Sequence, residues 1–424
     1  MEKIYDFIVV GSGAGGGTLA YELSKFNKNI LVIEKGKYEN ELGGKKNFSR
    51  YVDIVKSLEG INIMRAIMAG GTTVISAGNI VRCLESELKE KGIDLEEEFK
   101  DAEKELNLMP LSTKLMSESS TMFQGAARKL GYNFEPMPKC LDQENCNGCG
   151  LCITGCGLGH KWTSLDYLDK AIKNEVEAAY GANVTKIEPY GEGHSVICML
   201  NGEETSFKAR CVILAAGGLS TPVILQRSGI DEAGKNLSVD LLKHVYGFIP
   251  GKEFGAEPPM SMVDTEFLDE RGFILSTNTN LSVVKKYVQS QEEGFPYSIN
   301  SAIGIMIKIK DCPNGIVFPD GTVSKDVDVI DMEKFEFASK VIRDILLEIG
   351  ADRNHIFESH INGAHPLGTA AIGAIVDENL MTSTEGLYVC DASVFPAVPG
   401  LPPMLTIVAL AKRLGKYLNL RYQQ

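Results

Sequence analysis

A run of small residues near the start of the chain, with one acidic residue after it, has the types and spacing to hold a nucleotide. Residues 11–16 read Gly-Ser-Gly-Ala-Gly-Gly, and the acid is Glu34. In such a run Gly11 allows a tight turn, Gly13 lets the backbone approach a pyrophosphate, and Gly16 lets a helix pack closely on a strand. An acidic residue about 20 positions further on binds a ribose hydroxyl. The spacing predicts a dinucleotide site, and it leaves open whether the nucleotide is NAD or FAD.

A run of cysteines is the second group that could do chemistry. Five of the ten cysteines lie in the segment 140–161, and these are Cys140, Cys146, Cys149, Cys152 and Cys156. The last four have the spacing by which bacterial ferredoxins hold iron–sulfur clusters, although Gly157 stands where those proteins have proline. Three interpretations stay open: a [4Fe-4S] cluster, a Zn²⁺ site, or packed free thiols. A metal site would use Cys146, Cys149, Cys152 and either Cys156 or Cys140.

The elements around the glycine run are the ones that a dinucleotide site requires. Residues 5–10 form an apolar strand pattern, a helical pattern follows the glycines, and a second apolar strand over 30–33 ends at Glu34. The helix N-terminus in such a unit offers free N–H groups and the positive end of its dipole to the pyrophosphate. The unit predicts a Rossmann-like α/β domain.

Changes of pattern indicate how the rest of the chain is organised. Helical periodicity covers residues 95–106, 117–130, 164–179, 332–349 and 404–418. Strand patterns cover residues 183–188, 195–200, 205–208 and 211–216, and short strands fill most of 246–329. We expect an inserted antiparallel-sheet substrate domain of residues 244–349, with a ligand pocket at its interface with the rest of the chain. Residues 1–243 and 350–424 would form the nucleotide-binding domain.

Length and charge limit the functions that the chain can have. It has 424 residues, 44% of them hydrophobic, and a formal net charge of −13. The length favours two domains at roughly 150 residues each or somewhat more. The acidic balance argues against nucleic acid or an anionic membrane as a partner. Because no apolar run reaches the roughly 20 residues of a membrane span and no basic leader precedes the first strand, we expect a cytoplasmic protein without a transmembrane segment.

Further motifs follow the glycine run in one order. They are Gly70-Gly71-Thr72-Thr73-Val74 with Ser76-Ala77-Gly78-Asn79, then Ala215-Ala216-Gly217-Gly218, then His365-Pro366-Leu367-Gly368-Thr369, then Asp391-Ala392-Ser393 and Leu405-Thr406-Ile407. This set resembles the glucose–methanol–choline (GMC) family of FAD-dependent oxidoreductases. The cysteine run, followed by Gly159-His160-Lys161 and Ser164, is similar to the fatty-alcohol-oxidase branch of that family.

The resemblance implies that the nucleotide is FAD and assigns it a set of contacts. Small residues at 70–79 suit a backbone that lies against the flat flavin ring. The helix after Pro402-Pro403 can stabilise negative charge on the pyrimidine edge of that ring. The expected FAD contacts are Gly11, Ser12, Gly13, Ala14, Gly15, Gly16, Glu34, Lys35, Gly70, Gly71, Thr72, Ala77, Gly78, Asn79, Val184, Ala216, Gly217, Asp391, Ala392, Met404 and Leu405.

Catalysis is expected to depend on His365. Oxidation of an alcohol by hydride transfer to flavin requires removal of the hydroxyl proton. An imidazole, with a reference pKa of about 6.5, can accept that proton near neutral pH. The family places such a histidine immediately before a Pro/Val-x-Gly-Thr segment, and residues 366–369 of this chain match it.

At one position the chain departs from the family pattern. Members usually carry a second His or Asn about four residues before the threonine of the last motif, where it helps to hold the substrate oxygen. Pro402 stands there in this chain. Since proline offers no side-chain donor or acceptor, a residue such as His360, Asn362 or Asn79 takes that role, or the chemistry is not ordinary alcohol oxidation.

Three functions follow from these features. The first is an FAD-dependent dehydrogenase that oxidises the CH–OH group of a small alcohol-type substrate. It would pass electrons to a non-oxygen acceptor such as an electron-carrier protein, because a nearby cluster would offer an exit for single electrons. The second is a flavin-dependent reductase of a carbonyl or alkene, which the presence of Pro402 favours. The third is a non-catalytic electron-transfer flavoprotein subunit, in which His365 would lie away from the flavin ring.

Overall fold

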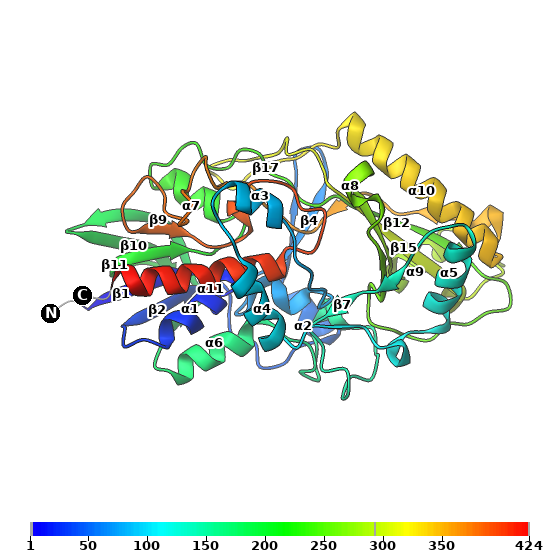
Figure 1. Cartoon of the computed structure of the whole chain (residues 1–424), viewed down its shortest axis with the longest axis horizontal. Helices are drawn as coiled ribbons and strands as arrows, with labels where there is room; N and C mark the ends of the chain where they lie inside the picture. The colour runs from blue at the N-terminus through cyan, green and yellow to red at the C-terminus, as the bar shows by residue number, and fades with distance from the viewer. Residues whose placement is uncertain (1–2, 292–293, 423–424) are drawn as a thin grey trace.

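Two sheets form the frame of the molecule, shown in Figure 1 by a computed structural model that describes residues 3–291 and 294–422. The first sheet has the strand order β8-β2-β1-β11-β10-β9, with β20 also paired to β11. Its strands are β1 (Ile4–Val10), β2 (Ile30–Glu34), β8 (Glu177–Tyr180), β9 (Ala182–Tyr190), β10 (Gly193–Leu200), β11 (Glu203–Leu214) and β20 (Leu387–Val389). The pairs among β8, β2, β1, β11 and β20 are parallel, whereas β10 pairs antiparallel with both β11 and β9. Because β1 and β2 are almost continuously apolar, they suit the doubly covered centre of a parallel sheet.

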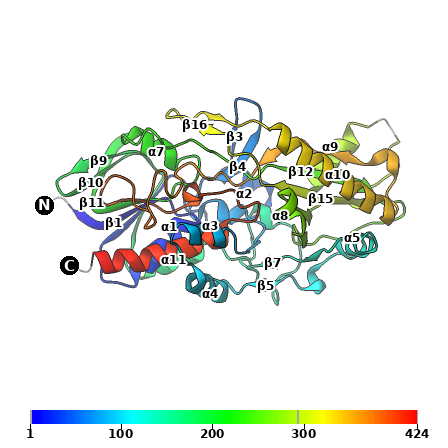
Figure 2. The same ribbon diagram turned by 45° about the horizontal axis from the view of Figure 1, so that its top comes forward.

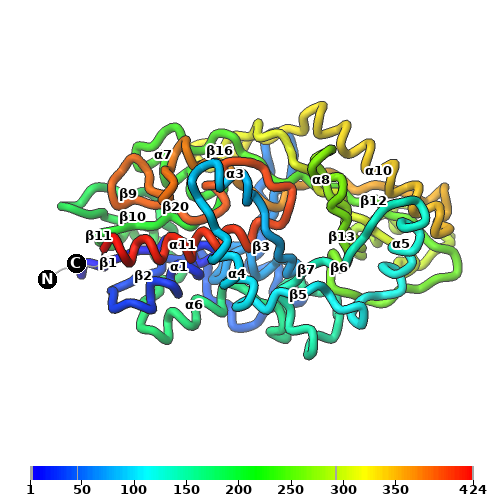
Figure 3. Tube along the Cα trace, viewed as in Figure 1, coloured from blue at the N-terminus to red at the C-terminus, as the bar shows by residue number. Residues whose placement is uncertain are grey.

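Three helices pack together against this sheet. They are α1 (Ala14–Ser24), α6 (Ser164–Lys173) and α11 (Met404–Arg421), and α1 contacts both of the others. The ring of Tyr21 on α1 stacks on Tyr167 of α6, with centroids 5.1 Å apart. The last helix returns to the first strand, where the rings of Phe7 and Tyr422 meet edge to face. Figure 3 shows how this brings the two ends of the chain to the same end of the molecule.

The second sheet has the strand order β3-β4-β19-β12-β15-β14-β13-β6, with β18 also paired to β12. Its strands are β3 (Val52–Lys56), β4 (Asn62–Ala66), β6 (Glu135–Pro136), β12 (Leu242–Phe248), β13 (Met262–Asp264), β14 (Phe273–Thr277), β15 (Ala302–Ile309), β18 (Phe357–Glu358) and β19 (Asn362–Gly363). Most pairs are antiparallel, and only β19 with β4 is parallel among the described pairs of this sheet. Helices α10 (Val329–Ile349) and α5 (Glu118–Lys129) lie on its outer side (Figure 2).

Alternation along β12 assigns residues to the two faces of the second sheet. A Cβ on Gly247 would lie 3.1 Å from Ala351 Cβ and 3.3 Å from Leu346 on α10, so this face is covered by that helix. Lys308 belongs to the opposite face, because it pairs with Leu242 in the register of β12 and β15. His244 lies on the Lys308 face as well.

The remaining elements are short. They are α2 (Gly44–Tyr51), α3 (Glu85–Glu90), α4 (Glu96–Glu105), α7 (Thr221–Arg227), α8 (Phe267–Arg271), α9 (Leu281–Gln289), β5 (Met109–Pro110), β7 (Pro138–Lys139), β16 (Ile316–Val317) and β17 (Val323–Ser324). The 3₁₀ turns are η1 (Gly71–Ile75), η2 (Thr113–Leu115), η3 (Cys152–Thr154), η4 (Ile299–Ser301), η5 (Arg353–His355) and η6 (Ala392–Val394). In the described residues, no helix combines the length and apolarity needed to cross a membrane.

The structure corrects some of the expected element boundaries. The helix expected over 164–179 ends at Lys173, because Glu175 takes a left-handed conformation (φ +67°), and β8 then begins at Glu177. The strands expected over 205–208 and 211–216 are one strand, β11. The division into residues 1–243 with 350–424 and residues 244–349 stays a prediction. The second sheet also takes strands from 52–66, 135–136 and 357–363.

Candidate active site

The structure builds the expected turn at the end of β1. Gly11 has φ +96°, and a Cβ there would lie 2.3 Å from the Ala215 carbonyl oxygen. A Cβ on Gly16 would lie 1.9 Å from the Gly11 carbonyl oxygen, so glycine is needed for α1 to approach the turn. A Cβ on Gly13, in contrast, would meet no atom of the described residues within 4 Å. The first turn of α1 carries no acidic residue, and the space beside Gly13 is open.

Glu34 lies beside this turn. Its Oε2 accepts hydrogen bonds from the backbone N–H (3.0 Å) and the hydroxyl (2.7 Å) of Ser12, and its Oε1 accepts one from the Gly36 N–H (2.7 Å). Burial raises the pKa of Glu34, and these hydrogen bonds oppose the rise. A carboxylate has about four acceptor positions, so the three bonds leave capacity for a hydroxyl ligand.

Segments that are distant in sequence meet at the same turn. The Ser12 hydroxyl accepts a hydrogen bond from the Gly70 N–H (3.1 Å), and the Ser164 hydroxyl donates one to the Gly13 carbonyl (2.8 Å). A Cβ on Gly71 would lie 2.9 Å from the Cα of Gly13. The structure therefore brings the start of the predicted flavin segment against the predicted pyrophosphate turn.

Asp391 connects two other predicted segments. Its Oδ2 accepts a hydrogen bond from the Gly217 N–H and its Oδ1 accepts one from the Ser393 N–H, both at 2.8 Å. The carbonyl oxygen of Cys390, just before it, lies 1.8 Å from the position of a Cβ on Gly15. The 216–217 and 391–392 segments thus meet against the first turn of α1.

The other expected FAD contacts lie in varied places. Met404 and Leu405 are buried at the start of α11, and Val184 is buried in β9. Lys35 is exposed directly after β2. That these side chains contact a cofactor stays a prediction.

His365 is held by a buried acid. Its Nδ1 lies 2.9 Å from Oδ2 of Asp240, and the same oxygen lies 3.0 Å from Nζ of Lys308. Because a carboxylate only accepts, Nδ1 carries a proton, and Nε2 of the neutral ring keeps its lone pair. The side chain of His365 is 29% exposed, whereas that of Asp240 is 0% exposed. The acid therefore fixes the tautomer of an accessible imidazole.

Burial and the neighbouring charges shift the pKa values of both Asp240 and His365. Burial raises the pKa of Asp240, but the Lys308 ammonium and His365 outweigh it, and the pKa lies below its ordinary value. For His365, burial lowers the pKa and Lys308 lowers it further, while the hydrogen bond and charge of Asp240 oppose both. The pKa of His365 therefore lies below its usual 6.5, and the ring is neutral and able to accept a proton at neutral pH.

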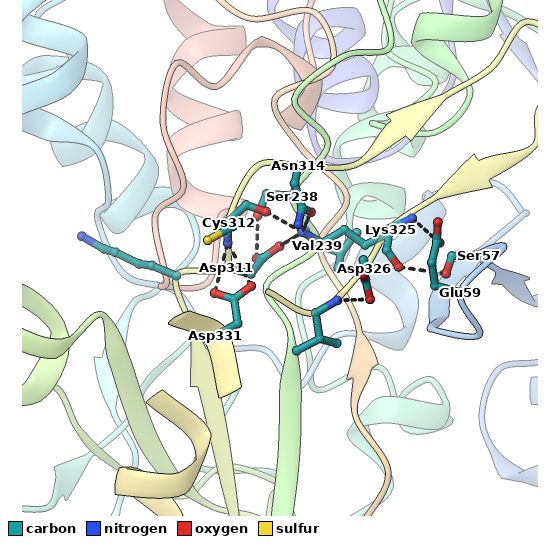
Figure 4. Close-up of polar contacts among 12 residues, drawn as sticks. Ser57, Glu59, Ser238, Val239, Asp311, Cys312, Asn314, Lys325, Asp326 and Asp331 are labelled. Atoms are coloured by element: carbon teal, nitrogen blue, oxygen red, sulfur yellow. Dashed lines mark hydrogen bonds and ion pairs between the residues drawn. The ribbon is translucent and has the colours of Figure 1, made fainter. Parts of the chain in front are cut away.

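A second buried ion pair positions the segment that carries Asp240. Nζ of Lys325 lies 2.8 Å from Oδ2 of Asp311, and both side chains are 0% exposed. Asp311 accepts a hydrogen bond from the Val239 N–H (3.2 Å), within the network drawn in Figure 4. The Val239 carbonyl in turn accepts a hydrogen bond from the His365 N–H (3.1 Å). The pair thus supports both backbone segments that bring Asp240 and His365 together.

The residues expected to substitute for the family's second His or Asn lie in different environments. His360 is exposed, and Asn362 contacts Asn62 at an exposed position. Asn79 is buried, accepts a hydrogen bond from Lys139 and donates one to the sulfur of Met260. That one of them holds a substrate oxygen stays a prediction.

The five cysteines of segment 140–161 lie in different environments. Among residues 3–291 and 294–422, no group of three or more His, Cys, Asp or Glu side chains could hold a metal ion. Cys149 is exposed, Cys146 and Cys156 are half-buried, and Cys140 and Cys152 are buried. Glycines with positive φ lie between them at positions 148, 150 and 155. None of these five cysteines forms a disulfide. The choice between a [4Fe-4S] cluster, a Zn²⁺ site and packed free thiols at these residues stays a prediction.

Reasoning from the sequence missed Asp240 and Lys308. Both lie between 240 and 340, where no motif was recognised. The available signal was one charged residue within each of two apolar runs, 237–242 and 303–309. A charge that is buried in such a run needs a partner, but the sequence does not tell which residue that partner is.

Comparison with known proteins decides the family. A GMC oxidoreductase family model matches residues 5–245, and a second GMC oxidoreductase model matches residues 327–411. The chain is a GMC oxidoreductase. The predicted family and the predicted α/β fold class, a Rossmann-like FAD domain with a sheet substrate domain, are confirmed.

Relatives of this GMC oxidoreductase include both uncharacterized proteins and alcohol oxidases. An uncharacterized protein of Methanocaldococcus jannaschii is 30% identical, over 97% of this chain and 98% of that protein. A long-chain-alcohol oxidase of Arabidopsis thaliana is 23% identical, over 96% of this chain and 66% of that protein. Among solved structures, pyridoxine 4-oxidase from Mesorbium loti is similar with a TM-score of 0.74 at 18% identity, covering 99% of both chains. A fungal aryl-alcohol oxidase has a TM-score of 0.70 at 16% identity, covering 100% of both.

Proposed function

We propose that this GMC oxidoreductase oxidises the CH–OH group of a small-molecule, alcohol-type substrate, with FAD as the hydride acceptor and His365 as the proton acceptor. The observation that carries the proposal is the contact of 2.9 Å between Nδ1 of His365 and the buried carboxylate of Asp240. It leaves Nε2 of a partly exposed imidazole ready to accept a proton.

The residues around α1 fit FAD. The space in front of Gly13 and the N–H groups of the first helical turn suit the pyrophosphate. Glu34 retains capacity for a ribose hydroxyl, and the segments 70–79 and 391–392 would lie along the flavin part. When bound, FAD supplies the acceptor for the hydride that leaves the substrate carbon.

His365 and Asp240 would handle the proton. As the carbon–hydrogen bond breaks, the hydroxyl proton passes to Nε2 of His365, and the substrate becomes an aldehyde or ketone. Asp240 stabilises the imidazolium that results, because its carboxylate accepts the Nδ1–H bond and lies in a buried, low-dielectric position. Lys308 keeps Asp240 ionised, since its ammonium lies 3.0 Å from the same oxygen.

The electron acceptor is a separate question. A dehydrogenase that uses an electron-carrier protein was expected because a metal cluster would pass on single electrons, and the described residues offer no such cluster. The long-chain-alcohol oxidase and pyridoxine 4-oxidase among the similar proteins make molecular oxygen an equal candidate for this chain. Reoxidation of the reduced enzyme by air, compared with artificial dyes under argon, separates the two.

Anaerobic rapid mixing tests the proposal directly. The purified protein is expected to carry FAD and to lose its flavin absorbance when mixed with a primary alcohol from a panel of long-chain, aryl and pyridine-type alcohols. The same experiment is made with His365→Ala. His194→Ala is its matched control, because His194 is a buried histidine of β10 that contacts the Glu385 carbonyl. Protein that binds no FAD, or holds FAD that no alcohol reduces while ketones or enones reoxidise the reduced form, contradicts alcohol oxidation. The second result favours the reductase alternative.

A further inference from the structure

A buried lysine lies behind the segment 73–79. Lys161 is 3% exposed, and its Nζ donates hydrogen bonds to four carbonyl oxygens. These belong to Val74 (2.7 Å), Ser76 (2.7 Å), Cys152 (3.0 Å) and Thr73 (3.3 Å). One ammonium group therefore binds three carbonyl oxygens of this segment and one carbonyl oxygen of the cysteine-rich segment.

A second buried lysine holds the other end of the same segment. Lys139 is 0% exposed, and its Nζ donates to Oδ1 of Asn79 (2.5 Å) and to the carbonyls of Pro259 (2.8 Å) and Ala77 (3.1 Å). Together, Lys139 and Lys161 contact five consecutive or near-consecutive residues of the 73–79 segment.

The hydrogen bonds favour the charged form of both lysines, although burial lowers the pKa of each to about 8, which still leaves them mainly charged at neutral pH. A neutral amine has two N–H donors, whereas each Nζ has three oxygen acceptors within 3.1 Å, which is the pattern of an ammonium group. Within the described part of the chain, neither lysine forms an ion pair with a carboxylate. Lys308, Lys325 and Lys412 differ, since each of these buried lysines contacts an Asp or Glu. Lys139 and Lys161 thus contribute buried positive charge that no ion pair cancels.

The direction of the carbonyls fixes the direction of the peptides. In a trans peptide the C=O and N–H groups point in opposite directions. Because the Ser76 carbonyl points to Lys161, the N–H of the same peptide, on Ala77, points away from that lysine. Gly78 (φ +74°) completes the turn, and a Cβ there would lie 3.3 Å from Cγ of Lys161. Two ammonium groups therefore hold one side of the segment, and the Ala77 N–H lies on the side away from Lys161.

We propose that Lys139 and Lys161 are positioning residues for the flavin, which hold the 73–79 segment against its ring and favour the reduced ring by their charge. This inference rests on the proposed function, in which FAD lies along this segment. Two electrons and one proton convert the neutral oxidised ring to the anionic reduced ring, so reduction adds one negative charge. Uncompensated positive charge nearby stabilises that form, and in a low-dielectric interior the effect extends over several ångströms.

The flavin midpoint potential tests the inference. Lys139→Met and Lys161→Met keep an apolar stem of similar length and remove the charge. Each is expected to lower the equilibrium constant for two-electron reduction at least about tenfold, which is about 30 mV for a two-electron couple. The potentials are measured against a reference dye during slow enzymatic reduction under argon. Lys412→Met is the matched control, because Lys412 is equally buried but contacts Glu22 and Glu105, and its potential is expected to equal that of the wild type.

If a Met variant does not retain FAD, its midpoint potential cannot be measured. FAD retention by a second variant, Lys161→Ala, is then measured instead. Lys161→Ala leaves a cavity lined by four carbonyl oxygens, and ammonium chloride is expected to restore FAD retention where sodium chloride at equal ionic strength does not. Met variants that hold FAD at the wild-type potential overturn the inference, and so does an Ala variant that ammonium does not rescue. Wild-type protein that binds no FAD contradicts the proposed function instead, so the two failures are distinguishable.

Discussion

Two buried Asp–Lys pairs lie close to each other in the structure, and they differ in how completely they are enclosed. Lys325 and Asp311 are both 0% exposed. Lys325 also donates to the Cys312 carbonyl (2.5 Å) and to Oδ1 of Asn314 (2.7 Å), and Asp311 accepts from the Ser238 hydroxyl (2.6 Å). The lysine has three oxygen partners, shown in Figure 4, and we call Lys325–Asp311 the closed pair because both side chains are fully buried.

The Lys308–Asp240 pair is open in two ways. Its third member, His365, is 29% exposed, so the cluster reaches a surface that a ligand can approach. Among the described residues, Oδ1 of Asp240 has no hydrogen-bond partner, although the atom is buried. Buried polar atoms in folded proteins are nearly always paired. The difference teaches that the closed pair serves the fold, whereas the open pair has the incomplete bonding and access that are typical of a reaction site.

The largest expected effect comes from the exposed member of the open cluster. His365→Ala is expected to slow flavin reduction by about 10²–10⁴-fold, because general base assistance is typically worth that much. Rapid mixing under argon measures the rate, and the absorbance ratio of flavin to protein checks that FAD stays bound. His365→Asn keeps a polar group that cannot take up the proton, so it should be as slow. A wild-type rate in the Ala variant would remove His365 from the chemistry.

A site could be predicted from the sequence where its residues lie close together along the chain, and could not where they come from distant segments. The turn at Gly11–Gly16 and the acid Glu34 were predicted from residues 5–34 alone, because the required turn, close approach and helix packing each demand glycine at a fixed position. His365 was predicted from a family motif. Its partners were not, because Asp240 lies just before β12 and Lys308 lies on β15, and no spacing rule connects them. The cysteine run stays a prediction, because its spacing allows a metal site but the burial of its thiols varies from exposed at Cys149 to buried at Cys140 and Cys152.

A smaller rate effect is expected from Asp240. Asp240→Asn keeps the shape of the side chain and an oxygen that can accept from Nδ1 of His365, but it removes the charge. A charge-assisted hydrogen bond is worth about 1.5–3 kcal/mol, so the rate of flavin reduction should fall roughly 10–100-fold. A loss of similar size in His365→Ala and in the double variant would show that the two residues act as one unit. Additive losses would contradict the positioning role of Asp240.

The closed pair should show the reverse behaviour. Lys325→Met leaves Asp311 buried without its partner, and breaking a buried pair in this way costs about 3–5 kcal/mol of folding free energy. Urea unfolding measures this loss. In the folded fraction, we expect flavin reduction to slow by less than about tenfold, because Asp240 keeps its contacts with His365 and Lys308. A rate loss as large as that of Asp240→Asn, without loss of stability, would contradict the contrast between the two pairs.

The smallest expected effect is a shift in pH dependence at the open cluster. His365 must be neutral to accept a proton, so the rate of flavin reduction falls as pH drops through its pKa, which burial and then Lys308 hold below 6.5. Lys308→Met removes the charge that lowers this pKa, so the pKa rises and the acidic limb of the pH–rate profile moves to higher pH. Asp240→Asn removes the charge that raises it, so the limb moves to lower pH. The control is the same profile for Lys325→Met. Neither charge beside His365 changes in this variant, so its acidic limb should stay at the wild-type position. Shifts of the same sign in the Lys308 and Asp240 variants would mean that another group, not His365, sets the acidic limb.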